Sequence, residues 1–179
     1  MTTATALEET VKETFAMDIR QASLDDLAAI AAIYDYEVHH GISTMDTVVR
    51  TPEAWQAWFD SHRCEAHPLL VAVDVDDVVI GWGSLSPWTD RGGHARTVEP
   101  SVYVRSDRRG HGVGRWLLGR LVDCARAAGH RVVVGRLYAE NMQCRKISRA
   151  NGFSIVGVVH AAGEKFGRVL DALIIERVL

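Results

Sequence analysis

Cysteine and long apolar runs are both scarce in this sequence, and their scarcity excludes several classes of protein. Three cysteines, Cys64, Cys124 and Cys144, occur in 179 residues, and no two of them form the Cys-x-x-Cys pair of a structural zinc site. No window reaches the roughly 18 uninterrupted apolar residues that a membrane-spanning helix needs. We therefore expect no disulfide framework, no metal and no membrane partner, and we interpret the chain as a reduced, cytoplasmic protein.

An excess of charge of one sign is also lacking. The chain has 20 basic and 23 acidic residues and a formal net charge of −3, so we expect no nucleic-acid partner. It is 47% hydrophobic and long enough to bury one substantial core. No apolar segment of the length that a secretory signal needs occurs in residues 1–16. We expect these residues to form a flexible N-terminal extension, with an ordered helical turn built from Leu7, Val11 and Phe15 as the alternative, and residues 17–179 to form one domain.

Hydrophobic periodicity predicts strands and helices that alternate along much of the chain. Strands are expected over residues 18–22, 69–73, 78–85, 94–104, 131–138, 153–159 and 166–179. Helices are expected to begin at residues 24, 51, 113 and 141. The run at 131–138 is apolar on both faces, which is typical of a buried parallel strand. The sequence therefore predicts a single α/β domain.

A glycine-rich turn between a predicted strand and a predicted helix, residues 108–114, is the most informative stretch. Glycines at positions 110, 112 and 114 remove side chains where a ligand approaches the backbone, and the free amides of the next helical turn attract phosphate. A tight connection without a ligand is the alternative. The spacing matches neither a nucleotide-triphosphate loop nor a dinucleotide fingerprint.

Arg109, Gly112 and Gly114 fit the pattern Arg-x-x-Gly-x-Gly, which resembles the pyrophosphate loop of the GCN5-related N-acetyltransferases (GNAT). Residues 97–104, 139–141 and 163–171 resemble the phosphinothricin N-acetyltransferase branch of that family, in order and at the expected separations. The resemblance covers residues 17–179. It implies a single-domain GNAT fold, with a mixed central sheet of about seven strands and about four helices.

The resemblance also implies an activity. An enzyme of this branch moves the acetyl group of acetyl-CoA to the primary amine of a small amino-acid-like acceptor, such as phosphinothricin or methionine sulfoximine. It is usually a homodimer whose acceptor site lies near the subunit interface. A protein N-terminal acetyltransferase and a non-catalytic acyl-CoA-binding module are the alternatives.

Glu99 is the candidate general base, because the branch carries its catalytic glutamate in the Thr-Val-Glu that stands here at residues 97–99. Burial on a central strand disfavours the charged form of a carboxylate and makes it a better proton acceptor at neutral pH. A solvent-facing glutamate at a strand end is the alternative. Pro100 cannot donate to a strand ladder and fits a strand that is splayed at this point. The backbone amide of Tyr103, or of a neighbour, is expected to polarise the thioester carbonyl.

Acetyl-CoA is expected to contact the glycine-rich turn and the strand before it. The candidate residues are Val102, Val104, Arg109, Gly110, His111, Gly112, Val113, Gly114, Arg115, Asn141 and Cys144. Cys144 as a nucleophile is disfavoured, because no histidine with a supporting carboxylate is recognisable beside it. Ser148 stands where the branch carries an acid for the departing thiolate, and water or Tyr138 is expected to replace that acid.

The acceptor pocket is expected to present cations, because acceptors of this branch carry a second anionic group. Arg96, Lys165 and Arg168 are the candidates. The resemblance also implies that residues 39–50 fold over the pocket, so that Tyr34 and Met45 touch the acceptor. For Tyr34, a place in the core is the alternative. The family pattern Ser/Thr-Phe-Glu reads Thr-Met-Asp at residues 44–46, which leaves the identity of the acceptor open.

Overall fold

The computed structural model describes residues 16–179, so the predicted N-terminal extension and its alternative helical turn lie outside the described residues, apart from Ala16. The strands are β1 (Asp18–Gln21), β2 (Arg63–Cys64), β3 (His67–Val73), β4 (Val79–Pro87), β5 (Thr97–Val104), β6 (Val132–Tyr138), β7 (Ser154–Lys165) and β8 (Arg168–Val178). The α-helices are α1 (Leu27–His40), α2 (Pro52–Asp60), α3 (Val113–Ala127) and α4 (Met142–Ala150).

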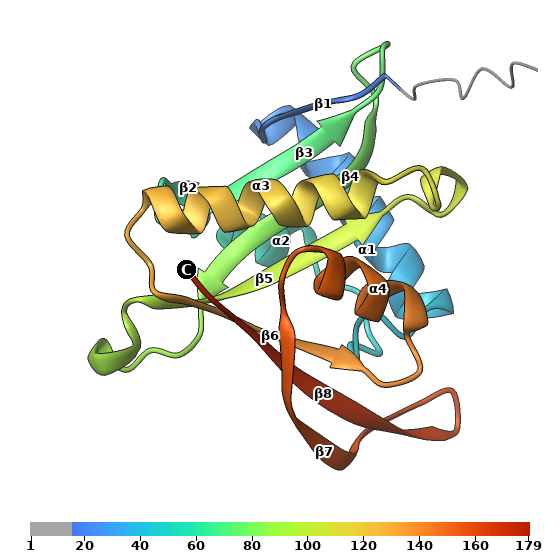
Figure 1. Cartoon of the computed structure of the whole chain (residues 1–179). Helices are drawn as coiled ribbons and strands as arrows, with labels where there is room; N and C mark the ends of the chain where they lie inside the picture. The colour runs from blue at the N-terminus through green and yellow to red at the C-terminus, as the bar shows by residue number, and fades with distance from the viewer. Residues whose placement is uncertain (1–15) are drawn as a thin grey trace, which may run out of the picture.

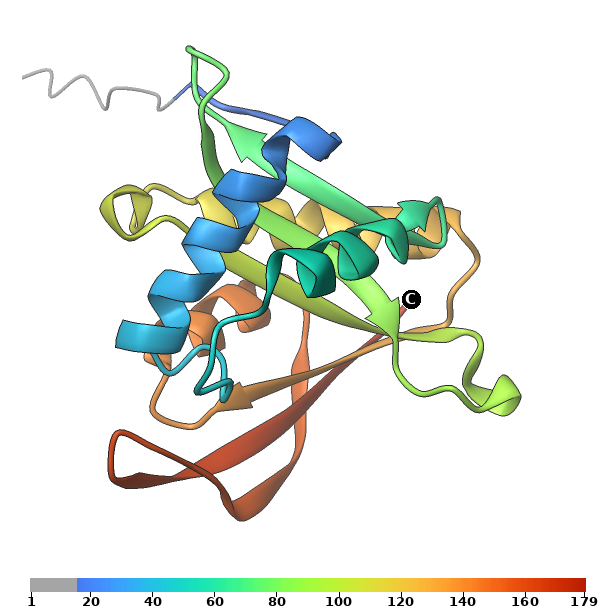
Figure 2. The same cartoon turned by 180° about the vertical axis from the view of Figure 1, so that it is seen from behind.

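Seven of the described strands form one mixed sheet in the order β1-β3-β4-β5-β6-β8-β7, and the two-residue β2 pairs with β3. Helices α3 and α4 lie on the face turned to the viewer in Figure 1, and α1 and α2 cover the other face in Figure 2. The prediction of an α/β domain with about seven strands and four helices is confirmed in the part of the chain that the structure describes.

Each face of the sheet buries its own core. On the α3 face, Leu117 and Leu121 pack against strand residues such as Ile80 and Val98. On the other face, residues of α1 and α2 surround Trp82, whose indole Nε1 donates to the carbonyl of Ile30 at 3.1 Å. Residues of β3 contribute alternately to the two cores, because successive strand side chains point to opposite faces.

Helix boundaries follow the capping residues that the sequence shows. The amide and the hydroxyl of Ser23 both bond to the carboxylate of Asp26, at 2.7 and 3.0 Å, and Ser23 is the N-cap of the 3-10 turn Leu24–Asp26 that leads into α1. Thr51 accepts a hydrogen bond from the amide of Ala54 at 3.2 Å and starts α2. Gly129 has a φ of 77° just after α3. None of the helices in residues 16–179 is long and apolar enough to cross a membrane.

Strands β5 and β6 diverge, and this divergence opens the sheet. They pair in parallel only at Thr97 with Val132 and at Val98 with Val133, whereas β5 pairs with β4 from Val98 to Val104. Pro100, which has no amide hydrogen, lies just beyond the last paired position. The structure therefore shows the splayed strand that the proline predicts.

Three predicted strands differ from the structure by more than one or two residues at an end or in their burial. Strand β5 begins at Thr97 rather than at residue 94, because residues 92–94 form a short 3-10 turn. Strand β6 buries only alternate residues, because only one of its faces meets a core. It pairs antiparallel with β8 along its length. The prediction that β6 is buried on both faces is therefore wrong. Strand β7 extends to Lys165, well beyond residue 159.

Candidate active site

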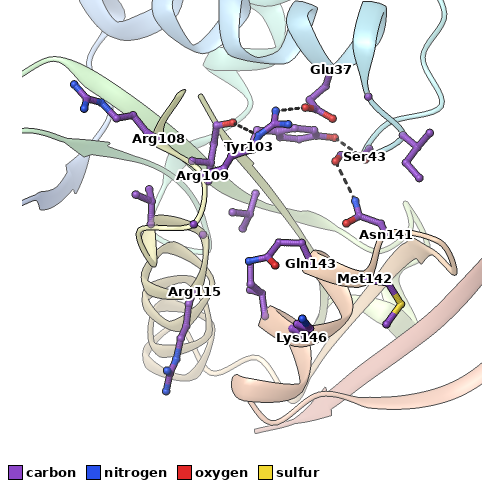
Figure 3. Close-up of a pocket in the computed structure, with 18 of the residues that line it drawn as sticks. Glu37, Ser43, Tyr103, Arg108, Arg109, Arg115, Asn141, Met142, Gln143 and Lys146 are labelled. Atoms are coloured by element: carbon purple, nitrogen blue, oxygen red, sulfur yellow. Dashed lines mark hydrogen bonds and ion pairs between the residues drawn. The ribbon is translucent and has the colours of Figure 1, made fainter. Parts of the chain in front are cut away.

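A cavity of about 780 Å³ lies at the open side of the sheet. The end of α1 with the loop after it, the end of β5, the glycine-rich turn, the start of α4 and the tip of the β7–β8 hairpin enclose it (Figure 3). Nine predicted acetyl-CoA residues line it: Val102, Val104, Arg109, Gly110, Gly112, Val113, Gly114, Arg115 and Asn141. The structure thus gathers most of the predicted acetyl-CoA residues around one hollow.

The glycine-rich turn has the backbone that a phosphate-binding loop needs. Gly110 and Gly112 have φ values of 86° and 87°, a region that favours glycine, and Gly112 is the N-cap of α3. The first amides of a helix have no intrahelical partner and lie at the positive end of its dipole. Because Gly112, Val113 and Gly114 all line the cavity, this end of α3 suits the pyrophosphate of a coenzyme.

Arg109 is held in the cavity by a residue that sequence reasoning missed. Its guanidinium forms an ion pair with Glu37 of α1, and its Nε donates to the carbonyl of Val104 at 3.2 Å (Figure 3). Glu37 is 3% exposed. Glu37 follows the buried Tyr34 by three residues and the buried Ile33 by four, so it lies on the apolar face of α1. A carboxylate on that face is the feature of the sequence that could have identified it.

A second missed residue, Ser43, joins the loop after α1 to the cavity wall. Its hydroxyl accepts from the side-chain amide of Asn141 at 3.2 Å, and its carbonyl accepts from the Tyr103 hydroxyl at 3.5 Å (Figure 3). Asn141 also caps α4 by accepting from the amide of Cys144 at 3.1 Å. Burial raises the pKa of Tyr103, so its hydroxyl stays protonated. Two predicted site residues are thus fixed by one loop serine.

Two predicted acetyl-CoA residues do not line the cavity. His111 is exposed within the glycine-rich turn. Cys144 is half-buried and packs against the core on the α3 face. Burial raises the pKa of its thiol to about 11, so the thiol stays protonated at neutral pH. Cys144 is therefore a packing residue of α4, which agrees with the expectation that it is no nucleophile.

Glu99 has a different setting from the buried one that the sequence predicts. It is half-buried on β5, and its two carboxylate oxygens accept from Nε and Nη2 of Arg136 on β6, at 3.1 and 3.3 Å. The Arg136 guanidinium lies 5.8 Å from the ring centre of Trp88. The splay between β5 and β6 leaves room for this pair, so an ion pair replaces the apolar burial that was predicted.

Tyr34 and Met45 lie behind the cavity and do not line it. Tyr34 is 5% exposed, and its hydroxyl bonds to Thr44 Oγ1 at 2.8 Å and to Asp46 Oδ2 at 2.6 Å. It lies in the core and anchors the loop, as the alternative has it, and its contact with the acceptor stays a prediction. Met45 is half-buried, and a Cβ on Gly163 would lie 3.0 Å from its sulfur. The loop after α1 therefore packs on the β7–β8 hairpin.

Lys165 was predicted to meet an anionic group of the acceptor, and the structure gives it another role. It is 3% exposed, and its Nζ donates to the carbonyls of Glu37 and Thr44, at 2.9 Å each. Burial lowers its pKa, and the charge of Glu37 opposes that shift. Its hydrogen bonds join the hairpin to α1 and to the loop. Its contact with an anionic group of the acceptor stays a prediction.

Replacing Lys165 with methionine should lower the free energy of unfolding by about 1–3 kcal/mol, because two backbone carbonyls each lose a hydrogen bond from the buried ammonium. Urea unfolding measures this change. Lys146→Met, at an exposed lysine of α4, is the matched control and should stay within about 0.5 kcal/mol of wild type. Unchanged stability in Lys165→Met, together with weaker binding of the amine, would instead show that Lys165 binds substrate.

The two predicted arginines of the acceptor pocket are both exposed. Arg96 precedes β5. Arg168 lines the cavity and forms an ion pair with Glu140, ahead of α4. Within residues 16–179, histidine, cysteine, aspartate and glutamate side chains form no group of three or more that could hold a metal ion.

Comparison with known proteins agrees with this geometry. Residues 29–153 match the sequence model of the acetyltransferase (GNAT) family. The chain is 39% identical over 153 residues to the L-methionine sulfoximine/L-methionine sulfone acetyltransferase of Pseudomonas aeruginosa, covering 86% of this chain and 89% of that protein. It is 36% identical over 155 residues to the L-amino acid N-acyltransferase MnaT of Escherichia coli, covering 87% and 90%.

A solved structure shares the fold as well. The GNAT superfamily phosphinothricin acetyltransferase of Sinorhizobium meliloti, in complex with acetyl-CoA, superposes with a TM-score of 0.88 at 30% identity. The alignment covers 91% of this chain and 88% of that chain. The chain therefore belongs to the acetyltransferase (GNAT) family and is an N-acetyltransferase that uses acetyl-CoA.

Proposed function

We propose that the enzyme acetylates the primary amine of a small amino-acid-like acceptor of the phosphinothricin or methionine sulfoximine type, with Glu99 as general base. One observation carries the proposal: Glu99 lies on the same strand whose far end, Val102 to Val104, lines the acetyl-CoA cavity. The names of the relatives support this class of acceptor. Strand β5 thus links the base to the acetyl donor.

The cavity fits acetyl-CoA, which supplies an activated acetyl thioester when it is bound. The free amides at the start of α3 would hold the pyrophosphate, and Arg109 would add a cation. Backbone groups of Val102 and Val104, on the side of β5 that has left β6, would pair with the amides of the pantetheine arm. The amide of Tyr103 or a neighbour would polarise the thioester carbonyl.

Glu99 would take a proton from the acceptor's ammonium group, directly or through a water. The two hydrogen bonds from Arg136 fix the orientation of the carboxylate. Ser148 is buried and does not line the cavity, so we assign no acid to it. A thiol has a pKa of roughly 8.5, so the thiolate is a tolerable leaving group near neutral pH without a dedicated acid. Arg96 and Arg168 remain the candidates for an anionic group of the acceptor.

The test is thiol release from acetyl-CoA against a panel of amines. The panel contains phosphinothricin, methionine sulfoximine, methionine sulfone, common amino acids and short N-terminal peptides. Turnover confined to small amino-acid-like amines would support the proposal. Turnover confined to the peptides would favour a protein N-terminal acetyltransferase, and binding of acetyl-CoA without turnover of any amine would contradict the proposed acceptor class.

We also propose that the enzyme is a homodimer, because β7 presents a long apolar edge. This strand has 12 residues and lies at the end of the sheet. Ile155, Val156, Val158 and Val159 are each between 46% and 58% exposed. An unpaired apolar edge of this length invites a strand from a second chain, or close packing against one.

Val156→Lys should convert the dimer to a monomer, because a charged side chain on an edge strand opposes pairing with another chain. Sedimentation velocity measures the change as a fall from the mass of two chains to the mass of one. Val75→Lys places the same charge at a residue that is 78% exposed in the β3–β4 turn, and it should leave the mass unchanged. A wild-type protein with the mass of one chain would refute the dimer.

A further inference from the structure

A histidine and a serine that the proposed mechanism leaves unused face each other beside Glu99. His62, two residues after α2, is 4% exposed, and its Nε2 lies 2.9 Å from Oγ of Ser86 on β4. Ser86 is the register partner of Glu99 on β5. Opposed residues of an antiparallel pair project to the same face, with Cβ atoms about 4.5–5.5 Å apart. The Ser86 hydroxyl and the Glu99 carboxylate are therefore neighbours on one face of the sheet.

The hydrogen bonds of His62 decide which ring nitrogen carries a hydrogen. Nδ1 lies 2.7 Å from the carbonyl oxygen of Trp58, which can only accept, so Nδ1 carries the hydrogen. The Ser61 hydroxyl donates to that same carbonyl at 2.6 Å and lies 3.0 Å from Nδ1, which fits this assignment. Burial lowers the pKa of His62, so the ring is neutral at neutral pH and Nε2 is a bare acceptor.

Ser86 must therefore donate its one hydroxyl hydrogen to His62. A serine oxygen also has two lone pairs, and these are all that the hydroxyl can offer to another molecule. Ser86 is half-buried rather than sealed in the core, in contrast with Ser84, which is 1% exposed on the same face. The neutral His62 thus makes Ser86 an acceptor, and not a donor, toward anything that sits beside Glu99.

We propose that Ser86 is a further acceptor-binding residue, whose oxygen accepts a hydrogen bond from the amino group of the acceptor, and that His62 is the positioning residue that turns the hydroxyl hydrogen away from that amine. This inference rests on the proposed function, because it places the acceptor nitrogen at Glu99. An ammonium group has three hydrogens to donate, and the carboxylate and the hydroxyl offer acceptors from adjacent strands. The pair therefore favours an amino group at this point and disfavours a carboxylate.

Ser86→Ala should raise the KM for the amine about ten- to a hundredfold, the usual effect of losing a hydrogen bond to a charged group. The KM for acetyl-CoA should change less than about twofold, because Ser86 does not line the acetyl-CoA cavity. Ser84→Ala is the matched control. It removes a hydroxyl from the same strand and face, one that is buried with no hydrogen-bond partner among residues 16–179, and should leave both KM values unchanged.

His62 is tested by the pH dependence of the amine's KM. Below its lowered pKa, the ring of His62 gains a hydrogen on Nε2 and donates to Ser86, whose own hydrogen then turns toward the amine. Because burial lowers that pKa, the KM for the amine should rise only at pH values below the ordinary histidine pKa of about 6.5. The groups that face His62 are Arg50 before α2, Trp58 and Ser61 at the end of α2, His67 on β3 and Ser86 on β4.

His62→Gln keeps a side-chain carbonyl that can accept from Ser86 but removes the titration. It should preserve the KM for the amine at neutral pH and flatten its rise in acid, whereas His62→Ala should raise the KM at every pH. Glu99 is retained in all these variants, so the comparison isolates His62. If the hydrogen bond between His62 and Ser86 only joins the segment after α2 to β4, the His62 variants should lose stability without a change in the pH profile of the amine's KM.

The inference and the proposed function fail in different ways. If the wild-type enzyme turns over no amine of the panel, the proposed function fails, and the inference fails with it. If the wild type turns over an amine while Ser86→Ala keeps the wild-type KM for it, the inference alone is overturned. If Ser86→Ala does not fold, the pH dependence decides instead. A rise of the amine's KM in acid that is identical in wild type and His62→Gln would overturn the inference.

Discussion

Replacing Glu99 with glutamine should lower kcat about 10²- to 10⁴-fold, which is the usual contribution of a positioned general base. Glutamine keeps the shape of the side chain but cannot take a proton from the ammonium group of the acceptor. The KM for acetyl-CoA should stay near the wild-type value, because Glu99 does not line the acetyl-CoA cavity. Steady-state thiol release with a turned-over amine, with both substrates varied, measures kcat and the two KM values separately.

Two control variants separate the base from its ion pair. Arg136→Met removes the partner but leaves the carboxylate, so it should reduce kcat less than Glu99→Gln if Arg136 only orients Glu99. Glu164→Gln makes the same chemical change at an exposed site on β7 and should leave kcat within about twofold. Equal losses in Glu99→Gln and Arg136→Met would show that the ion pair, and not proton transfer, carries the effect.

Local signals in the sequence predicted the parts of the site that neighbouring residues determine. The turn at Gly110 and Gly112 follows from glycine's access to positive φ, and the start of α3 follows from the apolar period after it. The caps at Ser23 and Thr51 likewise depend on residues three positions away. Such features act over a few residues, so they can be read before the chain topology is known.

The parts that sequence reasoning missed depend on contacts between distant segments. The partners in the Arg109–Glu37 pair are 72 residues apart, and Lys165 bonds to a carbonyl 128 residues before it. The divergence of β5 from β6 decides that Glu99 meets an arginine, and only the sheet order shows which strand supplies that arginine. A buried lysine or glutamate is rare without a partner, so each was a signal that a partner exists, without showing which one.

Gly112→Ala should raise the KM for acetyl-CoA about tenfold or more and lower the stability by about 1 kcal/mol. The stability loss comes from the φ of 87°, which a residue with a Cβ adopts only at a cost. The protein itself has room for the methyl group, since its nearest neighbours would be atoms of Trp116 at 3.5 and 3.6 Å. The methyl group would enter the cavity where the pyrophosphate approaches the backbone.

Gly129→Ala separates the two effects on the same helix. Gly129 follows the other end of α3 with a φ of 77°, and a Cβ there would meet nothing within 4 Å. The two variants should therefore lose similar stability in urea unfolding, because both force alanine into the left-handed region. Only Gly112→Ala should weaken the binding of acetyl-CoA, as measured by the KM for acetyl-CoA and by calorimetric titration. Equal KM values in the two variants would mean that the start of α3 does not hold the pyrophosphate, and that the cavity binds the coenzyme through its other walls.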